Sequence, residues 1–142
     1  MLTSARNQLS GKITAIQRGA VNDEVTIGLP DGQSVAAIVT HGSTESLGLE
    51  VGGAAFALVK ASWIILLTDS AGVKLSTRNQ LAGTVTEVTI GAVNAEVTLT
   101  LGSGDVITAI ITNDSVRNLG LTLGAKASAA FKASHVIIGV KA

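Results

Sequence analysis

Hydrogen-bond donors recur at matched positions in the two halves of this sequence, and they are the residues that could do chemistry. Serine, threonine, arginine and lysine near positions 4–6, 40–43 and 60–62 return 72 residues later (76 − 4 = 72). A tetrahedral oxyanion accepts many hydrogen bonds and donates few or none, so hydroxyl, guanidinium, ammonium and backbone N–H groups suit it. No acidic cluster is retained in the same way. The retained donors are Ser4 and Ser76, Arg6 and Arg78, Thr40 and Thr112, Ser43 and Ser115, Lys60 and Lys132, and Ser62 and Ser134.

Each of these residues also has a structural interpretation. Ser43 could cap a helix, Thr40 is an ordinary strand residue, and Arg6 could pair with a carboxylate of another chain. Taken singly, the structural interpretation is preferred for each one. The joint retention of six donors favours an anion site.

Catalytic, metal and cofactor sites are not expected from the sequence. His41 and His135 occupy different positions of the repeat, with Asn113 and Trp63 as their counterparts, so neither is a repeated base or metal ligand. No glycine-rich phosphate loop precedes a helix, which argues against nucleotide cofactors. The sequence therefore predicts a binding protein rather than an enzyme.

The donors must be positioned by a unit that the chain contains twice. About 30 of the 67 aligned positions are identical between residues 4–70 and 76–142, without a gap. A repeat of this regularity determines the domain organisation before any residue chemistry is considered. We expect one domain at residues 1–69, a linker at 70–75 and a second domain at 76–142.

The unit itself has the alternation of short, half-buried strands. Pro30-Asp31-Gly32 predicts a turn, because proline sets φ and glycine accepts the left-handed conformation. A helical turn with Ser43 as its N-cap is expected at 43–48. Five strands with a helical turn after the third indicate an all-β fold of two OB-like barrels, with SH3-like barrels as the alternative. In the first unit the strands are expected at 9–15, 24–29, 34–40, 54–60 and 63–68.

Composition constrains the partners. The 142 residues are 46% hydrophobic and only 14% charged, so copies are expected to cover one another in a homo-oligomer. Ten basic and ten acidic residues cancel, and aromatic residues make up 2% of the chain, which disfavours binding to nucleic acid or an anionic membrane. With no cysteine and no long apolar run, a soluble, cytoplasmic protein is expected.

Several motifs together resemble the Mop domain of molybdate-binding proteins. They are SARNQLSG, GAVNDEVTI, the VT-x-x-S of residues 39–43, LGL and KAS, and the second repeat carries the same set. A tandem of two such units resembles a two-domain molbindin. The resemblance implies OB-like barrels, six Mop units around a threefold axis in a homotrimer, and molybdate or tungstate held at subunit and domain interfaces for storage or homeostasis.

The resemblance also implies which residues contact the anion. Ala5 becomes Thr77 in the second repeat, which could add a hydroxyl, and the change from His41 to Asn113 predicts unequal sites. The rival functions are an oligomeric scaffold without an anion ligand and an OB-fold protein that binds nucleic acid. A possible second anion site comprises Val21, Asn22, His41, Val93, Asn94 and Asn113. The main positions are Ser4, Ala5, Arg6, Thr40, Ser43, Lys60, Ala61 and Ser62, with Ser76, Thr77, Arg78, Thr112, Ser115, Lys132, Ala133 and Ser134.

Overall fold

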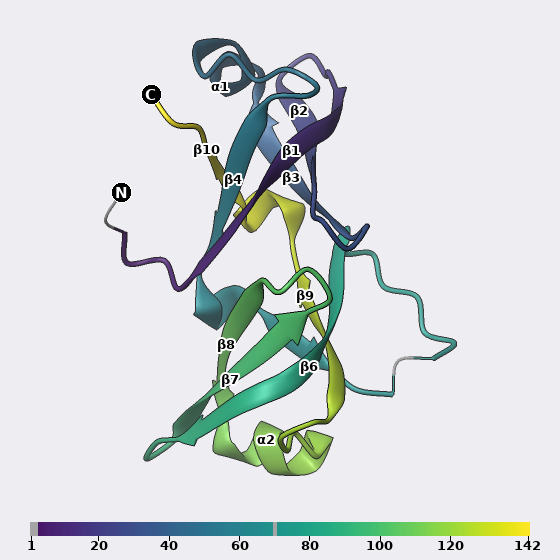
Figure 1. The fold of residues 1–142 in the computed structure, drawn as a ribbon, viewed down its shortest axis with the longest axis vertical. Helices are drawn as coiled ribbons and strands as arrows, with labels where there is room; N and C mark the ends of the chain where they lie inside the picture. Colours follow the sequence, from purple (N-terminus) through teal and green to yellow (C-terminus); the bar gives the residue numbers. More distant parts are fainter. Residues whose placement is uncertain (1–2, 70) are drawn as a thin grey trace.

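Two five-stranded antiparallel sheets dominate the computed structural model of the chain, which describes residues 3–69 and 71–142 (Figure 1). Each repeat contributes five strands, one α-helix and one 3-10 helix, so the all-β prediction is confirmed. In the first repeat these are β1 (Asn7–Gln17), β2 (Asn22–Gly28), β3 (Ser34–Thr40), α1 (His41–Ser46), β4 (Ala54–Val59), η1 (Ala61–Trp63) and β5 (Ile65–Leu67). In the second they are β6 (Asn79–Ile90), β7 (Asn94–Leu101), β8 (Val106–Thr112), α2 (Asn113–Leu119), β9 (Lys126–Phe131), η2 (Ala133–His135) and β10 (Ile137–Gly139).

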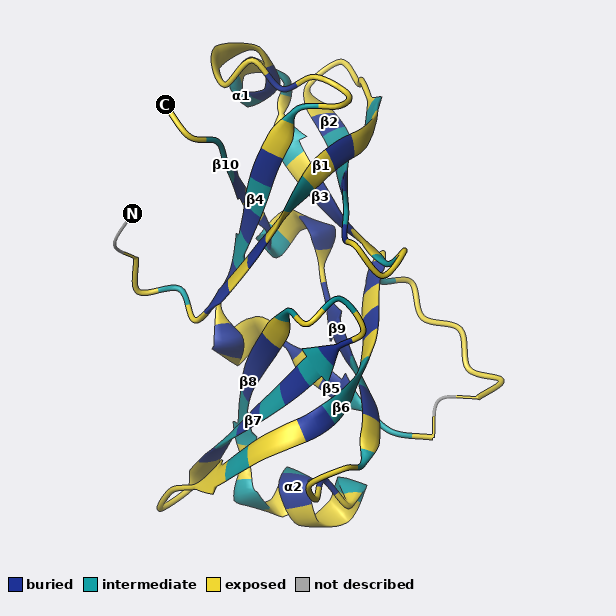
Figure 2. Ribbon diagram, in the orientation of Figure 1, coloured by how far each residue is buried: buried dark blue, intermediate teal, exposed yellow. Residues whose placement is uncertain are grey.

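Strand alternation explains where the core lies. Val25 and Ile27 of β2 are fully buried, while Thr26 between them is partly exposed. This is the pattern of a strand with one face on a core. The predicted turn after β2 is present, and Gly32 adopts a φ of 87° there. Dark-blue bands alternating with lighter ones along the strands in Figure 2 show the same period in both sheets.

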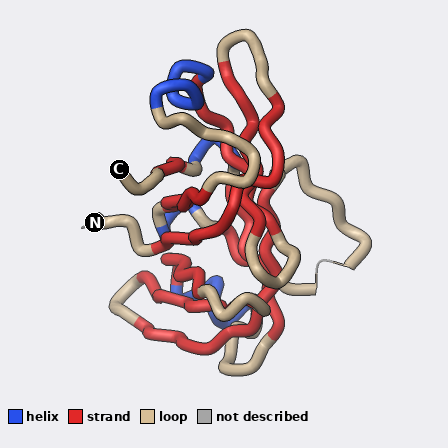
Figure 3. The backbone as a smooth tube through the Cα atoms, turned by 45° about the horizontal axis from the view of Figure 1, so that its top comes forward, coloured by secondary structure: helices blue, strands red, loops and turns tan. Residues whose placement is uncertain are grey.

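The fifth strand of each repeat belongs to the sheet of the other repeat. The strand orders are β10-β4-β1-β2-β3 and β5-β9-β6-β7-β8. In the first sheet Ile138 of β10 lies opposite Ala57, and in the second Leu66 of β5 lies opposite Ala129. Each sheet therefore includes one strand from the other repeat, on the far side of the linker predicted at residues 70–75. In Figure 1 the yellow β10 lies beside β4, and Figure 3 shows the strands of the molecule, in red, from a second direction.

Two buried asparagines join the sheets. Asn79 accepts a hydrogen bond from the N–H of Ala36 at 2.7 Å and donates to its carbonyl at 2.8 Å. Asn7 forms the same pair of bonds with Thr108, at 2.7 and 2.8 Å. Each amide thus extends the edge strand of the opposite repeat as a backbone segment would. This contact explains why Val35, Ala36 and Ala37 are buried in succession.

The helices begin earlier than expected. The N-cap of α1 is Thr40 rather than Ser43: its backbone is extended (φ −67°, ψ 149°) and its hydroxyl accepts a hydrogen bond from the Ser43 N–H. Thr112 caps α2 in the same way. The threonine hydroxyl reaches the N–H three residues on, so Ser43 falls inside the first turn. The two helices lie at opposite ends of the long axis (Figure 1). No helix within the described residues is long and apolar enough to cross a bilayer.

Candidate anion-binding site

Two of the predicted donor segments leave the first sheet side by side. Asn7 at the start of β1 pairs with Val59 at the end of β4, so residues 4–6 emerge beside residues 60–62. The second repeat repeats the arrangement, with Asn79 opposite Phe131. Antiparallel pairing therefore brings the residue that follows Arg6 opposite the one that precedes Lys60, and the residue that follows Arg78 opposite the one that precedes Lys132. In the second repeat, Ser76, Thr77 and Lys132 also line one cavity.

These paired segments face the opposite repeat. The 3-10 helix η1 packs against β8, and η2 packs against β3. Arg6 bonds to Glu96 of β7, which pairs in register with Ile110, two residues before Thr112. Arg78 bonds to Glu24, which pairs with Ile38, two residues before Thr40. Each candidate set therefore combines an S-x-R and a K-A-S segment from one repeat with the strand that leads to Thr40 or Thr112 in the other.

The third group of donors does not meet the other two within the chain. The hydroxyls of Thr40 and Ser43 lie 2.8 Å apart, and those of Thr112 and Ser115 lie 2.9 Å apart. Across the described residues, no hydrogen bond joins either pair to the S-x-R or K-A-S segments. The structure thus brings the S-x-R and K-A-S segments together, and it places the Thr40–Ser43 and Thr112–Ser115 pairs at the ends of β3 and β8.

Both arginines are held by carboxylates of the opposite repeat. Nη1 and Nη2 of Arg6 donate to the two carboxylate oxygens of Glu96 at 2.7 and 3.0 Å, and Arg78 pairs with Glu24 at 2.6 Å. Hydrogen bonding from Arg6 lowers the pKa of Glu96, and the same bond raises the pKa of Arg6. A guanidinium has five N–H donors. The fork to Glu96 uses two of the donors of Arg6 and fixes its orientation, which leaves three for another acceptor.

The lysines differ from the arginines in having no carboxylate partner. Among residues 3–69 and 71–142, neither Lys60 nor Lys132 lies within ion-pair distance of an acidic side chain. Lys60 Nζ lies 5.1 Å from the centre of the Trp63 ring. Trp63 also stacks on His135, its counterpart in the repeat, with ring centres 4.7 Å apart. Two ammonium groups that have no carboxylate partner among these residues are suited to an anion.

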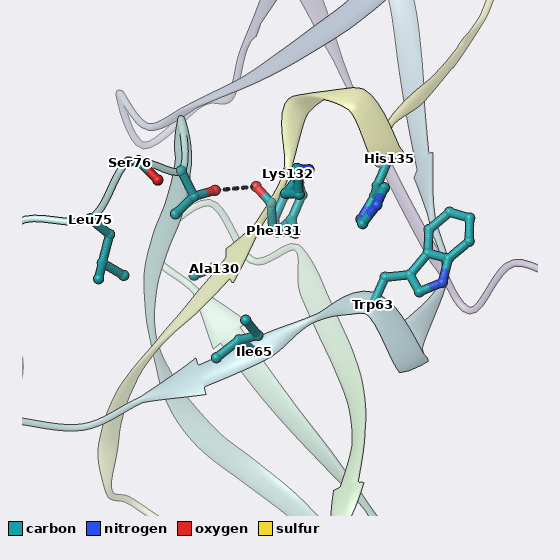
Figure 4. A pocket seen from close by; sticks show the side chains of 9 residues that line it. Trp63, Ile65, Leu75, Ser76, Ala130, Phe131, Lys132 and His135 are labelled. Carbon is teal, nitrogen blue, oxygen red and sulfur yellow. Dashed lines mark hydrogen bonds between the residues drawn. The ribbon is translucent and has the colours of Figure 1, made fainter.

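A cavity of about 280 Å³ lies beside the second set of donors (Figure 4). Ser76 and Lys132 line it together with apolar side chains, including Ile65 and Leu75. The Thr77 hydroxyl, which the sequence suggested as an additional anion donor, instead donates to the carbonyl of Phe131 at 2.7 Å. That hydroxyl is therefore already used within the chain.

The residues of the possible second site do gather, at the two ends of the molecule. We call Val21, Asn22 and His41 the α1 pole, and Val93, Asn94 and Asn113 the α2 pole. At the α1 pole the His41 N–H donates to the Val21 carbonyl at 2.9 Å, and Asn22 pairs with Thr40. At the α2 pole Asn113 and Val93 form the same bond at 2.9 Å. The Asn113 side chain donates to the carbonyl of Gly91.

Sequence reasoning missed the acidic residues of the site. Glu24 and Glu96 are retained at the 72-residue offset, so their pairing with arginine could have been suspected from the repeat alone. Asp23 is buried and bonds to His41, with Nδ1 3.1 Å from Oδ2. It falls at an inward position of the β2 alternation, with Val25 and Ile27. A lone carboxylate in an apolar alternation was the available signal.

Comparison with known proteins supports the tandem organisation. The family model described as TOBE domain matches residues 3–66 and 75–138. A solved structure of the cytoplasmic molybdate-binding protein ModG, with molybdate bound, is 52% identical, has a TM-score of 0.95, and covers 99% of this chain and 100% of its own. Molybdenum transport protein ModE of Herbaspirillum seropedicae is 45% identical, and molybdenum-pterin-binding protein MopA of Rhodobacter capsulatus 44%, each over 99% of this chain. The chain spans about half the length of these two curated relatives, 52% and 53%.

Proposed function

The chain belongs to the TOBE domain family, with two Mop-type units in tandem, and from this premise we propose that it binds molybdate. The observation that carries the proposal is the likeness, over the whole length of both chains, to a structure of a molybdate-binding protein with the anion bound. That match covers 99% of this chain. The role is binding rather than catalysis, and the ligands are molybdate and tungstate.

The local chemistry supports this assignment. Lys60 and Lys132 supply positive charge and have no carboxylate partner in the part of the chain that the structure describes, and three N–H donors of Arg6 remain after its fork to Glu96. Exposed serines, Ser4 and Ser62, stand on the two adjoining segments. Charge-assisted hydrogen bonds to an oxyanion are about twice as strong as neutral ones. The combination suits a dianion that offers no protons of its own.

We propose a homotrimer of six Mop units as the binding form. Large apolar side chains that are more than half exposed in the single chain support this, because a monomer rarely exposes so many. A neighbouring copy would also bring its Thr40–Ser43 or Thr112–Ser115 pair to the S-x-R and K-A-S segments, from which these pairs are separate in the single chain. These side chains include Val21, Val51, Ile65, Val93, Leu123 and Ile137. In this assembly the poles lie on the threefold axis, and the protein stores or buffers the anion in the cytoplasm.

Equilibrium dialysis against molybdate, tungstate and sulfate, with the particle mass measured in the same solution, tests the proposal. We expect trimer-sized particles that retain molybdate and tungstate in preference to sulfate. A smaller anion leaves fixed donors unpaired, and each lost charge-assisted bond lowers affinity roughly 10- to 150-fold. A monomer that retains no oxyanion would contradict the proposal and favour the scaffold alternative.

Variants divide the candidate sets. Arg6→Ala should weaken one half of the main sites and Arg78→Ala the other half, while the double variant weakens both and leaves the poles occupied. The matched control is Gln8→Ala, an exposed neighbour on β1 that makes no side-chain bond within the described residues. Loss of all binding in either single arginine variant, with the trimer intact, would show that the sites are not divided in this way.

A further inference from the structure

The short strands β5 and β10 each have a nearer partner than the one they pair with. Only residues 60–64 separate β4 from β5, and only residues 132–136 separate β9 from β10. Folding back into a local hairpin would close a short loop, which costs less conformational entropy than closing a long one. Yet β5 pairs with β9, and β10 pairs with β4. Loop length therefore does not explain the exchange.

The last register pair of each exchanged strand combines a large residue with a small one. Gly139 of β10 lies opposite Phe56 of β4. Leu67 of β5 lies opposite Ser128 of β9. The two pairs occupy equivalent positions at the 72-residue offset of the repeat. Their sizes are reversed, because the small residue is on the exchanged strand in one sheet and on its partner in the other.

The Phe56 ring lies against the backbone of Gly139. A β-carbon at position 139 would overlap Cζ and Cε2 of that ring. Directly opposite residues of an antiparallel pair project from the same face with their Cβ atoms about 4.5–5.5 Å apart. A large side chain at position 139 would therefore displace the ring. Because β10 is the edge strand of its sheet, the ring also compensates for the side chain that this glycine lacks.

We propose that these size-matched pairs direct each of the two strands to the sheet of the unlike repeat. If β5 folded back on β4 in the register of the repeat, Leu67 would lie opposite Phe56. If β10 folded back on β9, Gly139 would lie opposite Ser128. One hairpin would crowd two large side chains and the other would leave two small ones, and the exchange avoids both combinations. The edge of β4 thus fits the strand that carries glycine, and the edge of β9 fits the strand that carries leucine.

The other register pairs do not distinguish the two strands. Ile65 and Ile137 occupy equivalent positions, and both are 62% exposed. The middle residue of each strand faces an alanine with no exposed surface, Ala57 or Ala129. Exchanging β5 with β10 would leave these contacts almost unchanged. Selection therefore depends on the 56–139 and 67–128 pairs, and it is independent of the proposed function.

A double-substitution cycle in the full chain measures the coupling within one pair. Gly139→Leu should displace the Phe56 ring, and Phe56→Ser should uncover the glycine, so each should raise the unfolding equilibrium constant. Together they reproduce the Leu67–Ser128 pair, and the double variant should be more stable than the sum of the two effects, by at least about twofold in that constant. Urea unfolding at one chain concentration measures this coupling. The matched control combines Phe56→Ser with Leu67→Gly, which lie in different sheets and should be additive.

Engineered disulfides report which strand occupies the edge of β4, since the chain has no cysteine of its own. Leu58 lies opposite Ile137, and a local hairpin would place Ile65 there instead. Opposite residues of an antiparallel pair have Cα atoms about 4.5–5.5 Å apart, which suits a disulfide. Leu58→Cys with Ile137→Cys should therefore form a bond readily, and Leu58→Cys with Ile65→Cys should not. Equilibration with glutathione gives an effective concentration for each cysteine pair.

Exchanging the selecting residues of the two strands is the decisive test. In a chain with Leu67→Gly and Gly139→Leu, the ratio of the two effective concentrations should shift about 2- to 30-fold toward the local hairpin, because two cross-strand pairs are mismatched. Adding Phe56→Ser and Ser128→Phe should restore the wild-type ratio. An unchanged ratio in the strand-exchanged chain, or additive effects in the cycle, would overturn the proposal. Neither measurement uses the anion, so neither outcome bears on the proposed function.

Discussion

Replacing Asn79 by alanine should destabilise the protein severely, because this one side chain satisfies two backbone groups of the other repeat. The amide bonds the N–H and the carbonyl of Ala36, and Asn79 itself has no exposed surface. Alanine would leave both groups buried without partners. Each unsatisfied buried group costs about 1–3 kcal/mol, so the free energy of unfolding should fall by about 2–6 kcal/mol. The total for a domain is only about 5–15 kcal/mol.

Urea and thermal unfolding, followed by circular dichroism at one chain concentration, measure this loss. The concentration must be fixed because association contributes to apparent stability. At about 2–4 °C per kcal/mol, the midpoint should fall by roughly 4–24 °C. Asn7→Ala removes the matching bonds to Thr108 and should have a similar effect. Gln80→Ala, at the exposed neighbouring position of β6, is the control and should stay within about 0.5 kcal/mol of wild type.

The refuting result is a loss below about 1 kcal/mol in both asparagine variants. Water would then have reached the backbone of β3 and β8, or apolar packing alone would hold the repeats together. Either finding would show that the hydrogen bonds of the Asn7 and Asn79 side chains contribute little to holding the two sheets together.

Three further predictions concern molybdate binding and the loss of stability at low pH. Lys60→Ala should lower molybdate affinity at its set by roughly 10- to 150-fold, since a charge-assisted bond is lost, as measured by dialysis; unchanged affinity would place the anion elsewhere. Trp63 is the one tryptophan of the chain and lies 5.1 Å from Lys60 Nζ, so molybdate should change its emission in wild type and much less in Lys60→Ala. The pKa of Asp23 is lowered from about 3.8, first by Thr44 and then by the Gly19 N–H and His41. Its carboxylate therefore stabilises the fold above that value and loses this effect as pH falls through its lower folded pKa. The gap in thermal midpoint between wild type and Asp23→Ala should close over that acid range, and a constant gap would contradict the assignment.

Strand positions and fold class could be predicted because burial alternates with the period of a strand. Val25 and Ile27 face the core whichever chain segment covers them. The exchange of β5 and β10 could not be predicted in this way. Both are short apolar strands at the same repeat position, and alternation alone would allow either to complete either sheet. Their partners depend on long-range geometry, which a local pattern does not contain.

The repeat predicts the donors of the candidate site, and these stay a prediction, but it does not predict the partners that the structure gives them. The repeat identified Arg6 and Lys60 equally, yet the structure gives Arg6 a carboxylate partner and, within the described ranges, gives Lys60 none. Glu96 comes from the other repeat, more than eighty residues away in sequence, so no spacing rule connects it with Arg6. The Thr77 hydroxyl illustrates a different limit. A donor that looks available in sequence can be used by a nearby carbonyl, here that of Phe131.

Because β5 and β10 are exchanged, cleavage of the linker would not by itself separate the two repeats. A protease that severed residues 71–75 would leave two fragments, each still contributing a strand to the other's sheet, and separation would require pulling a strand out of each sheet. The covalent join is therefore dispensable for cohesion once the chain has folded. The covalent link ensures that every first repeat is paired with one second repeat. Two identical halves would have to carry identical ends, whereas joined halves are free to diverge, as they have with Asp23 and His41 at one end and Ala95 and Asn113 at the other.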